Sequence, residues 1–285
     1  MILIQFLNGL SAAMLLFLLA SGLTLIFGVL GVINFAHGSL YMLGAYFSYS
    51  LVLFFGNYWL SLLVAPVVVA IFAGLIELAF LRRLYLRAHE FQLLLLYSFV
   101  LILDDVVKAL WGTELKLVPK PEALAGSVEI LGRTFPAYTM LIIVLGPAVA
   151  LVLWYILNRT RIGKQVVAAS LDREAANALG MNVPFLFTAV FVFGAWLGGL
   201  GGAVAAPLRA ASPGMGMEIM IMSFAVVIVG GLGNIWGALI GSLVIGEVLA
   251  FGTLIVPKMV VLLPFAFMIL IFLWKPQGLL GKGGG

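Results

Sequence analysis

Long apolar runs with almost no charge are the feature that most constrains this chain. The runs at 59–81, 136–157 and 183–206 approach or exceed the roughly 20 residues that a helix needs to cross about 30 Å of hydrocarbon. Of the 285 residues, 64% are apolar and 9% are charged, against about 45–50% and about 25% in a soluble globular domain. We therefore predict an all-α, polytopic transmembrane bundle, with residues 1–285 forming a single membrane domain.

The apolar runs predict about eight or nine membrane segments, some of them short or broken. They lie at 5–27, 37–55, 59–81, 91–111, 136–157, 184–206, 218–232, 234–251 and 258–274. The seventh and eighth segments are short and nearly continuous in sequence. They form either two crossings, or one crossing and a broken or re-entrant piece.

Lysine and arginine set the predicted orientation. They gather after the third, fifth and last segments, which nine crossings place on one side of the membrane. The positive-inside rule makes this side cytoplasmic, with the N-terminus and loop 112–135 outside and loop 158–183 inside. The net charge of +4 is explained by this placement, so we expect lipid around the chain and no nucleic-acid partner.

Residues typical of catalysis or metal binding are scarce. The chain has two histidines, His37 and His89, and no cysteine, and it lacks a His-Glu-x-x-His motif, so we predict no metal site and no enzyme activity. The string at 278–283 has the wrong spacing for a Walker A loop. We therefore expect no cofactor in this chain, and any ATP that drives it must bind to partner subunits.

Polar residues within apolar segments are candidates for the pathway or for helix breaks, because charge at the bilayer centre is costly. They are Asn34, His37, Ser39, Asp104 and Glu247. The stretch 34–39 interrupts two apolar helices, and a structural role for His37 is favoured over a pathway role. Asp104 can pair with Lys108 one turn later, either as a local ion pair or in the pathway. Glu247 faces protein or a water-filled path, and a proton relay stays open. Glu77 is expected to reach the cytoplasmic interface.

Two glycine series recur at every fourth residue. They are Gly194, Gly198 and Gly202, and Gly233, Gly237 and Gly241. This spacing exposes backbone along one helix face, so that another helix can approach closely. Packing within the subunit is favoured, and a subunit interface is the alternative. A faint internal similarity also relates residues 28–33 to residues 230–235.

The stretch Gly22–Tyr46 closely resembles the opening of permeases from branched-chain amino acid ABC transporters. The late Gly230–Ala238 string and the closing Lys275–Gly281 string are similar to other parts of that family. The resemblance implies a pathway for branched-chain or other hydrophobic amino acids in a bacterial-type inner membrane. It also implies three kinds of partner: a homologous or identical second permease subunit, two cytoplasmic ATPases and an extracytoplasmic solute-binding protein.

Other functions stay open beside this one. A branch of the same family moves urea or short amides. An ion-coupled secondary transporter would use Glu247 or the Asp104–Lys108 pair, and a membrane enzyme without transport activity is a third hypothesis.

Loop 158–183 carries a second family motif. Glu174, Ala175, Ala176 and Gly180 match the Glu-Ala-Ala-x-x-x-Gly start of the cytoplasmic coupling motif of ABC importer permeases, although its Ile-x-Leu-Pro tail is replaced at 190–193. Asp172 suits the start of a short helix and Gly180 suits its end. The resemblance implies that this helix contacts the ATPase, with the small alanines entering a groove on the partner. An ordinary amphipathic connector is the alternative.

Overall fold

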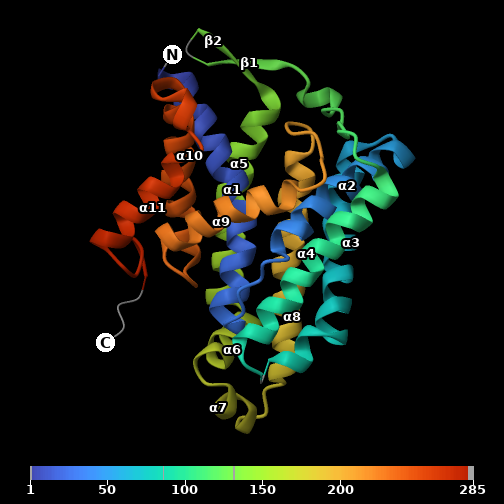
Figure 1. Cartoon of the computed structure of the whole chain (residues 1–285), viewed down its shortest axis with the longest axis vertical. Helices are drawn as coiled ribbons and strands as arrows, with labels where there is room; N and C mark the ends of the chain where they lie inside the picture. Colours follow the sequence, from blue (N-terminus) through green and yellow to red (C-terminus); the bar gives the residue numbers. More distant parts are fainter. Residues whose placement is uncertain (1, 86, 131, 282–285) are drawn as a thin grey trace.

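The computed structural model describes residues 2–85, 87–130 and 132–281, which form a bundle of helices with one small hairpin (Figure 1). The helices are α1 Ile2–Leu30, α2 His37–Phe55, α3 Tyr58–Ala79, α4 His89–Trp111, α5 Ala137–Arg159, α6 Arg161–Leu171, α7 Arg173–Ala178, α8 Val183–Ala205, α9 Met215–Gly230, α10 Ile235–Ile255 and α11 Leu263–Trp274. Three 3₁₀ turns lie at Leu81–Leu84 (η1), Glu122–Leu124 (η2) and Pro257–Met259 (η3). The strands are β1 Ser127–Ile130 and β2 Arg133–Pro136, paired antiparallel.

Each of the nine predicted apolar segments contains a helix, which confirms the all-α membrane fold. In the described part of the chain, six helices are long and apolar enough to cross a membrane: α1, α2, α3, α5, α8 and α10. Helix α4 has similar length but carries Asp104, Asp105 and Lys108, and α9 and α11 are shorter apolar helices.

Helix α1 forms the centre of the bundle (Figure 1). Its apolar stretch is 89% buried, and α5, α8, α9 and α10 pack around it. A helix that is hydrophobic on every side is stable only when it is surrounded by protein or lipid. Protein meets this need for α1, whereas α3 and α5 leave many of their apolar side chains exposed.

The two longest connections lie at opposite ends of the molecule. Figure 1 shows β1 and β2 at the end where α1 begins, and α6 and α7 at the other end. Loops 112–135 and 158–183 are thus separated in the way that the charge pattern predicts. Which end faces the cytoplasm stays a prediction.

Helix α9 differs from the long helices because it runs across the middle of the bundle in Figure 1. It ends at Gly230, and Gly231 and Gly233 follow with φ of 106° and 76°. Glycine adopts such positive φ values without the steric cost that other residues meet. The side chain of Asn234 then accepts a hydrogen bond from the Gly237 N–H at 3.2 Å and starts α10. The seventh and eighth segments are therefore two helices separated by a break at 231–234.

The first glycine series lies where α8 packs against α1 and α2. A Cβ on Gly202 would collide with the Tyr41 carbonyl of α2. A Cβ on Gly194 would lie 3.0 Å from the Gly22 carbonyl oxygen of α1. These glycines permit backbone-to-backbone packing, and all of these contacts are within one chain.

His37 fills a space that glycines leave. It is 0% exposed, and its Nε2 lies 3.1 Å from the carbonyl oxygen of Leu19. A Cβ on Gly22 would lie 2.8 Å from Nε2, and one on Gly198 would lie 3.3 Å from the same atom. His37 thus ties the start of α2 to the middle of α1.

We predict that His37→Leu destabilises the fold by about 1 kcal/mol, the usual net value of one buried hydrogen bond. The measurement is the thermal unfolding midpoint of the purified protein in detergent. His89→Leu is the matched control, because His89 is exposed at the start of α4. Equal midpoints for both variants and the unmutated protein would remove His37 from the packing of the bundle.

A labelling experiment tests the orientation. Ser127 in β1 and Asn177 in α7 are both exposed, and the chain has no native cysteine. Each residue is replaced by cysteine in a separate variant. In intact cells, an impermeant thiol reagent should label Ser127→Cys from outside, and it should label Asn177→Cys only after the membrane is opened. Outside labelling of Asn177→Cys would reverse the predicted topology.

Candidate functional site

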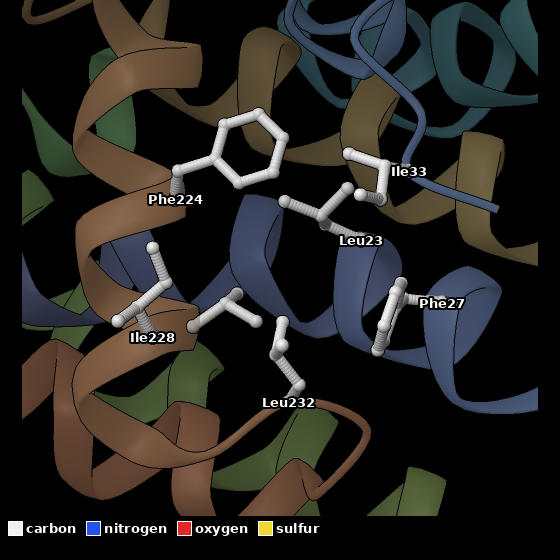
Figure 2. Close-up of a pocket in the computed structure, with 7 residues that line it drawn as sticks. Leu23, Phe27, Ile33, Phe224, Ile228 and Leu232 are labelled. Carbon is white, nitrogen blue, oxygen red and sulfur yellow. The ribbon is translucent and has the colours of Figure 1, made fainter. Parts of the chain in front are cut away.

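An apolar pocket lies between α1 and α9. Its volume is about 150 Å³, and its lining residues are Leu23, Phe27, Ile33, Phe224, Val227, Ile228 and Leu232. Figure 2 shows side chains of α1 and α9 facing the same space, with Ile33 and Leu232 at its edges. Every lining residue is apolar. The pocket can therefore hold an aliphatic group, but it offers no side chain for acid–base or nucleophilic chemistry.

Two helix breaks meet at this pocket. Helix α1 ends at Leu30, and Gly31 follows with φ of 71° before α2 begins at His37. A Cβ on Gly28 would lie 3.0 Å from the Cα of Gly233, in the break between α9 and α10. The two stretches that resemble each other in sequence are thus in direct contact. Sequence reasoning noted their similarity but did not place them together.

The second glycine series belongs to this region. A Cβ on Gly237 would collide with the Gly230 carbonyl, and one on Gly241 would collide with the Val226 carbonyl. Helix α10 therefore turns back closely against α9 directly after the break.

The C-terminal segment holds the second break in place. The Leu279 N–H donates to the Val229 carbonyl at 2.8 Å, and the Leu280 N–H donates to the Gly230 carbonyl at 3.0 Å. The Asn234 side-chain amide donates to the Leu280 carbonyl at 2.7 Å. The last carbonyls of a helix have no partner within it, so this segment supplies the donors that α9 lacks. Sequence reasoning missed this role of the closing string.

The polar residues of the first break do not line the pocket. Asn34 is 0% exposed and Ser39 is 2% exposed. Asn34 borders a separate, much smaller void with Leu96 and Phe191. Residues 34–36 lie in the interruption between α1 and α2 and residues 37–39 begin α2, while apolar side chains form the pocket surface.

Asp104 joins α4 to the start of α9. One of its carboxylate oxygens lies 2.6 Å from the Lys108 Nζ. The other accepts a hydrogen bond from the Gly214 N–H at 2.6 Å. Gly214 directly precedes α9 and has φ of 82°. The structure thus contains the local ion pair and adds a contact with α9 that sequence spacing could not reveal.

Glu247 lies where α10 packs against α1. Its carboxyl group faces Gly9, where a Cβ would lie 2.6 Å from the carboxyl carbon. Both of its carboxyl oxygens are buried and have no hydrogen-bond partner among the described residues. Glu247 is not among the residues that line the pocket.

Glu77, which was expected to reach the cytoplasmic interface, is buried inside the bundle near the end of α3. It is 0% exposed. The Tyr85 hydroxyl donates to one of its carboxylate oxygens and the Thr188 hydroxyl donates to the other, each at 2.8 Å. Because two hydroxyl groups donate to it, one just after η1 and one in α8, this carboxylate can be buried at a lower free-energy cost. Residue spacing along α3 alone did not indicate these partners.

Loop 158–183 contains two short helices, α6 and α7. The Asp172 carboxylate accepts a hydrogen bond from the Ala175 N–H at 2.9 Å and caps α7. Gly180 follows the helix with φ of 81°. The predicted helix between Asp172 and Gly180 is therefore confirmed.

Of the two alanines expected to enter a groove on the ATPase, only one lies on the exposed side of α7. Glu174 and Ala175 are exposed, but Ala176 is 2% exposed and packs inside its own chain. Ala176 therefore cannot enter a groove on another protein. Leu171 and Leu179 flank α7 and are 80% and 77% exposed. Sequence reasoning did not select them, although two leucines in a loop outside the apolar segments were a usable signal.

Comparisons with known proteins agree with this architecture. Residues 5–272 match the family described as "Branched-chain amino acid transport system / permease component". The chain is 29% identical to the high-affinity branched-chain amino acid transport system permease protein BraD of Pseudomonas aeruginosa, over 98% of this chain and 95% of that protein. It is 32% identical to the probable branched-chain amino acid transport permease protein LivH of Methanocaldococcus jannaschii, over 81% and 75% of the two chains.

A solved structure shares the fold. A chain of PsaBC from Streptococcus pneumoniae, solved in complex with a Fab, superposes with a TM-score of 0.52 at 14% identity, over 95% of this chain and 91% of that one. The family match extends over nearly the whole described bundle, including both helix breaks and the pocket between them. The chain therefore belongs to the family of permease components of branched-chain amino acid transport systems.

Proposed function

We propose that this chain is the membrane-spanning permease subunit of an ABC importer for branched-chain or other hydrophobic amino acids. With a second permease subunit, homologous or identical, it forms the translocation pathway in a bacterial-type inner membrane. Two cytoplasmic ATPase subunits drive it, and an extracytoplasmic binding protein delivers the amino acid. The observation that carries this proposal, beside the family, is the wholly apolar pocket at the junction of two helix breaks.

The pocket favours an aliphatic side chain over a small polar solute. Burying a valine, leucine or isoleucine side chain against apolar atoms is worth about 1.5–3 kcal/mol. Urea and short amides bring little or no aliphatic surface to gain this burial, and residues such as Phe27, Phe224 and Ile228 give their polar groups no hydrogen-bond partner. The chemistry of this surface therefore supports hydrophobic amino acids over the urea branch of the family.

The ion-coupled alternative receives less support. Asp104 is engaged by Lys108 and by the Gly214 N–H. Glu247 lies at the interface of α1 and α10, away from the pocket lining. Neither carboxylate is thus placed where it would meet a solute in the pocket.

The exposed side of α7 suits contact with an ATPase. The chain carries no Walker A loop, so in this proposal ATP binds to partner subunits and force enters through a cytoplasmic contact. Ala175 offers a narrow surface, and the exposed Leu171 and Leu179 add apolar area on either side of it. Exposed apolar groups outside the membrane segments are typical of contact surfaces.

The direct test is transport by the reconstituted complex. The chain is coexpressed with the other subunits of its own transport system, purified and placed in proteoliposomes with ATP at the ATPase side. We expect ATP-dependent uptake of leucine, isoleucine or valine, and much weaker uptake of urea or acetamide. Uptake that follows an ion gradient and ignores ATP would refute the proposal.

Filling the pocket should impair transport. Ile228→Trp places a larger side chain in a cavity of about 150 Å³, and overpacking of this kind typically costs about 1–3 kcal/mol. We predict that leucine uptake falls about tenfold, which corresponds to about 1.4 kcal/mol, while the ATPase stays bound. Leu273→Trp in α11 is the control, because Leu273 is 77% exposed. Full uptake by an intact Ile228→Trp complex would exclude the pocket from the pathway.

Added bulk on α7 should block contact with the ATPase. Ala175 is exposed, so Ala175→Trp should leave insertion and folding intact but reduce ATPase retention during purification and lower uptake. Ala123→Trp is the control, because Ala123 is an exposed residue of η2 in loop 112–135, far in sequence from α7. An Ala175→Trp complex that keeps its ATPase and transports at the unmutated rate would show that α7 is not the coupling element.

A further inference from the structure

We propose that Arg173 transmits movement of α7 to the pocket by holding the last carbonyl of α1. This inference rests on the proposed function, because it requires that an ATPase acts on α7. It assigns a positioning role to a residue outside the Glu-Ala-Ala motif, and it explains how a cytoplasmic contact can reach a pocket within the bundle.

Arg173 makes two defined contacts. Its Nη2 donates a hydrogen bond to the Leu30 carbonyl at 2.7 Å. Its guanidinium also lies over the Phe187 ring of α8, 4.8 Å from the ring centroid. The planar guanidinium can donate at its edge while it stacks through its face. Arg173 is the first residue of α7, so these contacts join α7 to both α1 and α8.

The contact with Leu30 lies next to the pocket wall. Leu30 is the last residue of α1, and the last carbonyls of a helix lack partners within it. Phe27, one turn earlier, and Ile33, three residues later, both line the pocket. A displacement of the Leu30 carbonyl therefore moves the backbone that carries both of these side chains.

The contact with Phe187 is held on the opposite side. The Phe187 ring lies edge-on to the Tyr85 ring, with 5.9 Å between centroids. The Tyr85 hydroxyl donates to Glu77 of α3, and Thr188 of α8 donates to the same carboxylate. Burial, together with the negative charge of Glu77, raises the pKa of Tyr85, so its hydroxyl keeps the proton that it donates.

These contacts give Arg173 one fixed and one movable neighbour. Helices α3 and α8 are joined through Glu77 and Thr188, so they form a common support under Phe187. The end of α1 is followed by the break at 31–36, where the backbone is not helical. In this proposal, movement of α7 is passed through the guanidinium to the Leu30 carbonyl, because the backbone that follows Leu30 is not held by helical hydrogen bonds.

The test compares variants of the whole reconstituted complex. Arg173→Ala removes both contacts, and Arg173→Lys keeps a positive donor but loses the planar stacking. Lys164→Ala is the matched control, because Lys164 is an exposed basic residue of α6 in the same loop. The measured quantities are ATPase retention, ATP hydrolysis with and without amino acid, and the number of amino acids imported per ATP.

We expect Arg173→Ala to retain its ATPase and to hydrolyse ATP, while import per ATP falls at least about fivefold, the lower end of typical coupling between sites. Arg173→Lys should restore part of the ratio, and Lys164→Ala should match the unmutated complex. An unchanged ratio in Arg173→Ala would overturn the inference. Loss of the ATPase from Arg173→Ala would also overturn it, since Arg173 would then only shape the docking surface. Failure of the unmutated complex to import amino acids with ATP would instead refute the proposed function.

Discussion

The need to satisfy every backbone polar group away from water is the constraint on which this structure depends. Unbroken helices meet it alone, but the breaks at 31–36 and 231–234 leave non-helical backbone within the bundle, which is tolerated only where protein or a water-filled cavity surrounds it. Here the chain supplies donors from distant segments. Arg173 donates to the Leu30 carbonyl, and the backbone of the C-terminal segment donates to the last carbonyls of α9. Loop 158–183 and the C-terminal segment therefore take part in the fold of the bundle.

The last turn of α1 also meets the second break. Gly28 and Gly233 lack side chains, so the backbone of α1 lies directly against the break at 231–234. The apolar pocket between α1 and α9 lies at this junction. A permease needs a surface that binds its solute weakly and changes shape when force is applied. In our proposal, the junction combines an aliphatic surface with a link to α7 through Arg173, and this is why we place both the selectivity and the coupling there.

Hydropathy was enough to predict the nine apolar helices, and capping residues predicted α7, because both depend on local sequence. Helix α6 was not predicted, because it lies outside the apolar segments. Contacts between helices could not be predicted in this way. Helices α1 and α9 carry apolar residues on every face. The spacing of apolar residues along α9 therefore does not distinguish Phe224 and Ile228, which line the pocket, from residues of the core. The inward face of Ala176 and the burial of Glu77 were not foreseen, because both depend on contacts with residues distant in sequence. Gly22 and Gly198 make room for the His37 ring, and their distance from His37 in sequence gave no sign of this contact.

The central claim is that the pocket changes shape when ATP acts on the complex. The most direct measurement is the distance between spin labels attached to Ile33→Cys and Leu232→Cys, which lie at two edges of the pocket and are 38% and 51% exposed in the native residues. The distance is recorded by pulsed electron resonance in the complete complex, without nucleotide and with trapped ATP. Our account predicts two distinct distance distributions. The same distribution in both states, in a complex shown to transport, would contradict it.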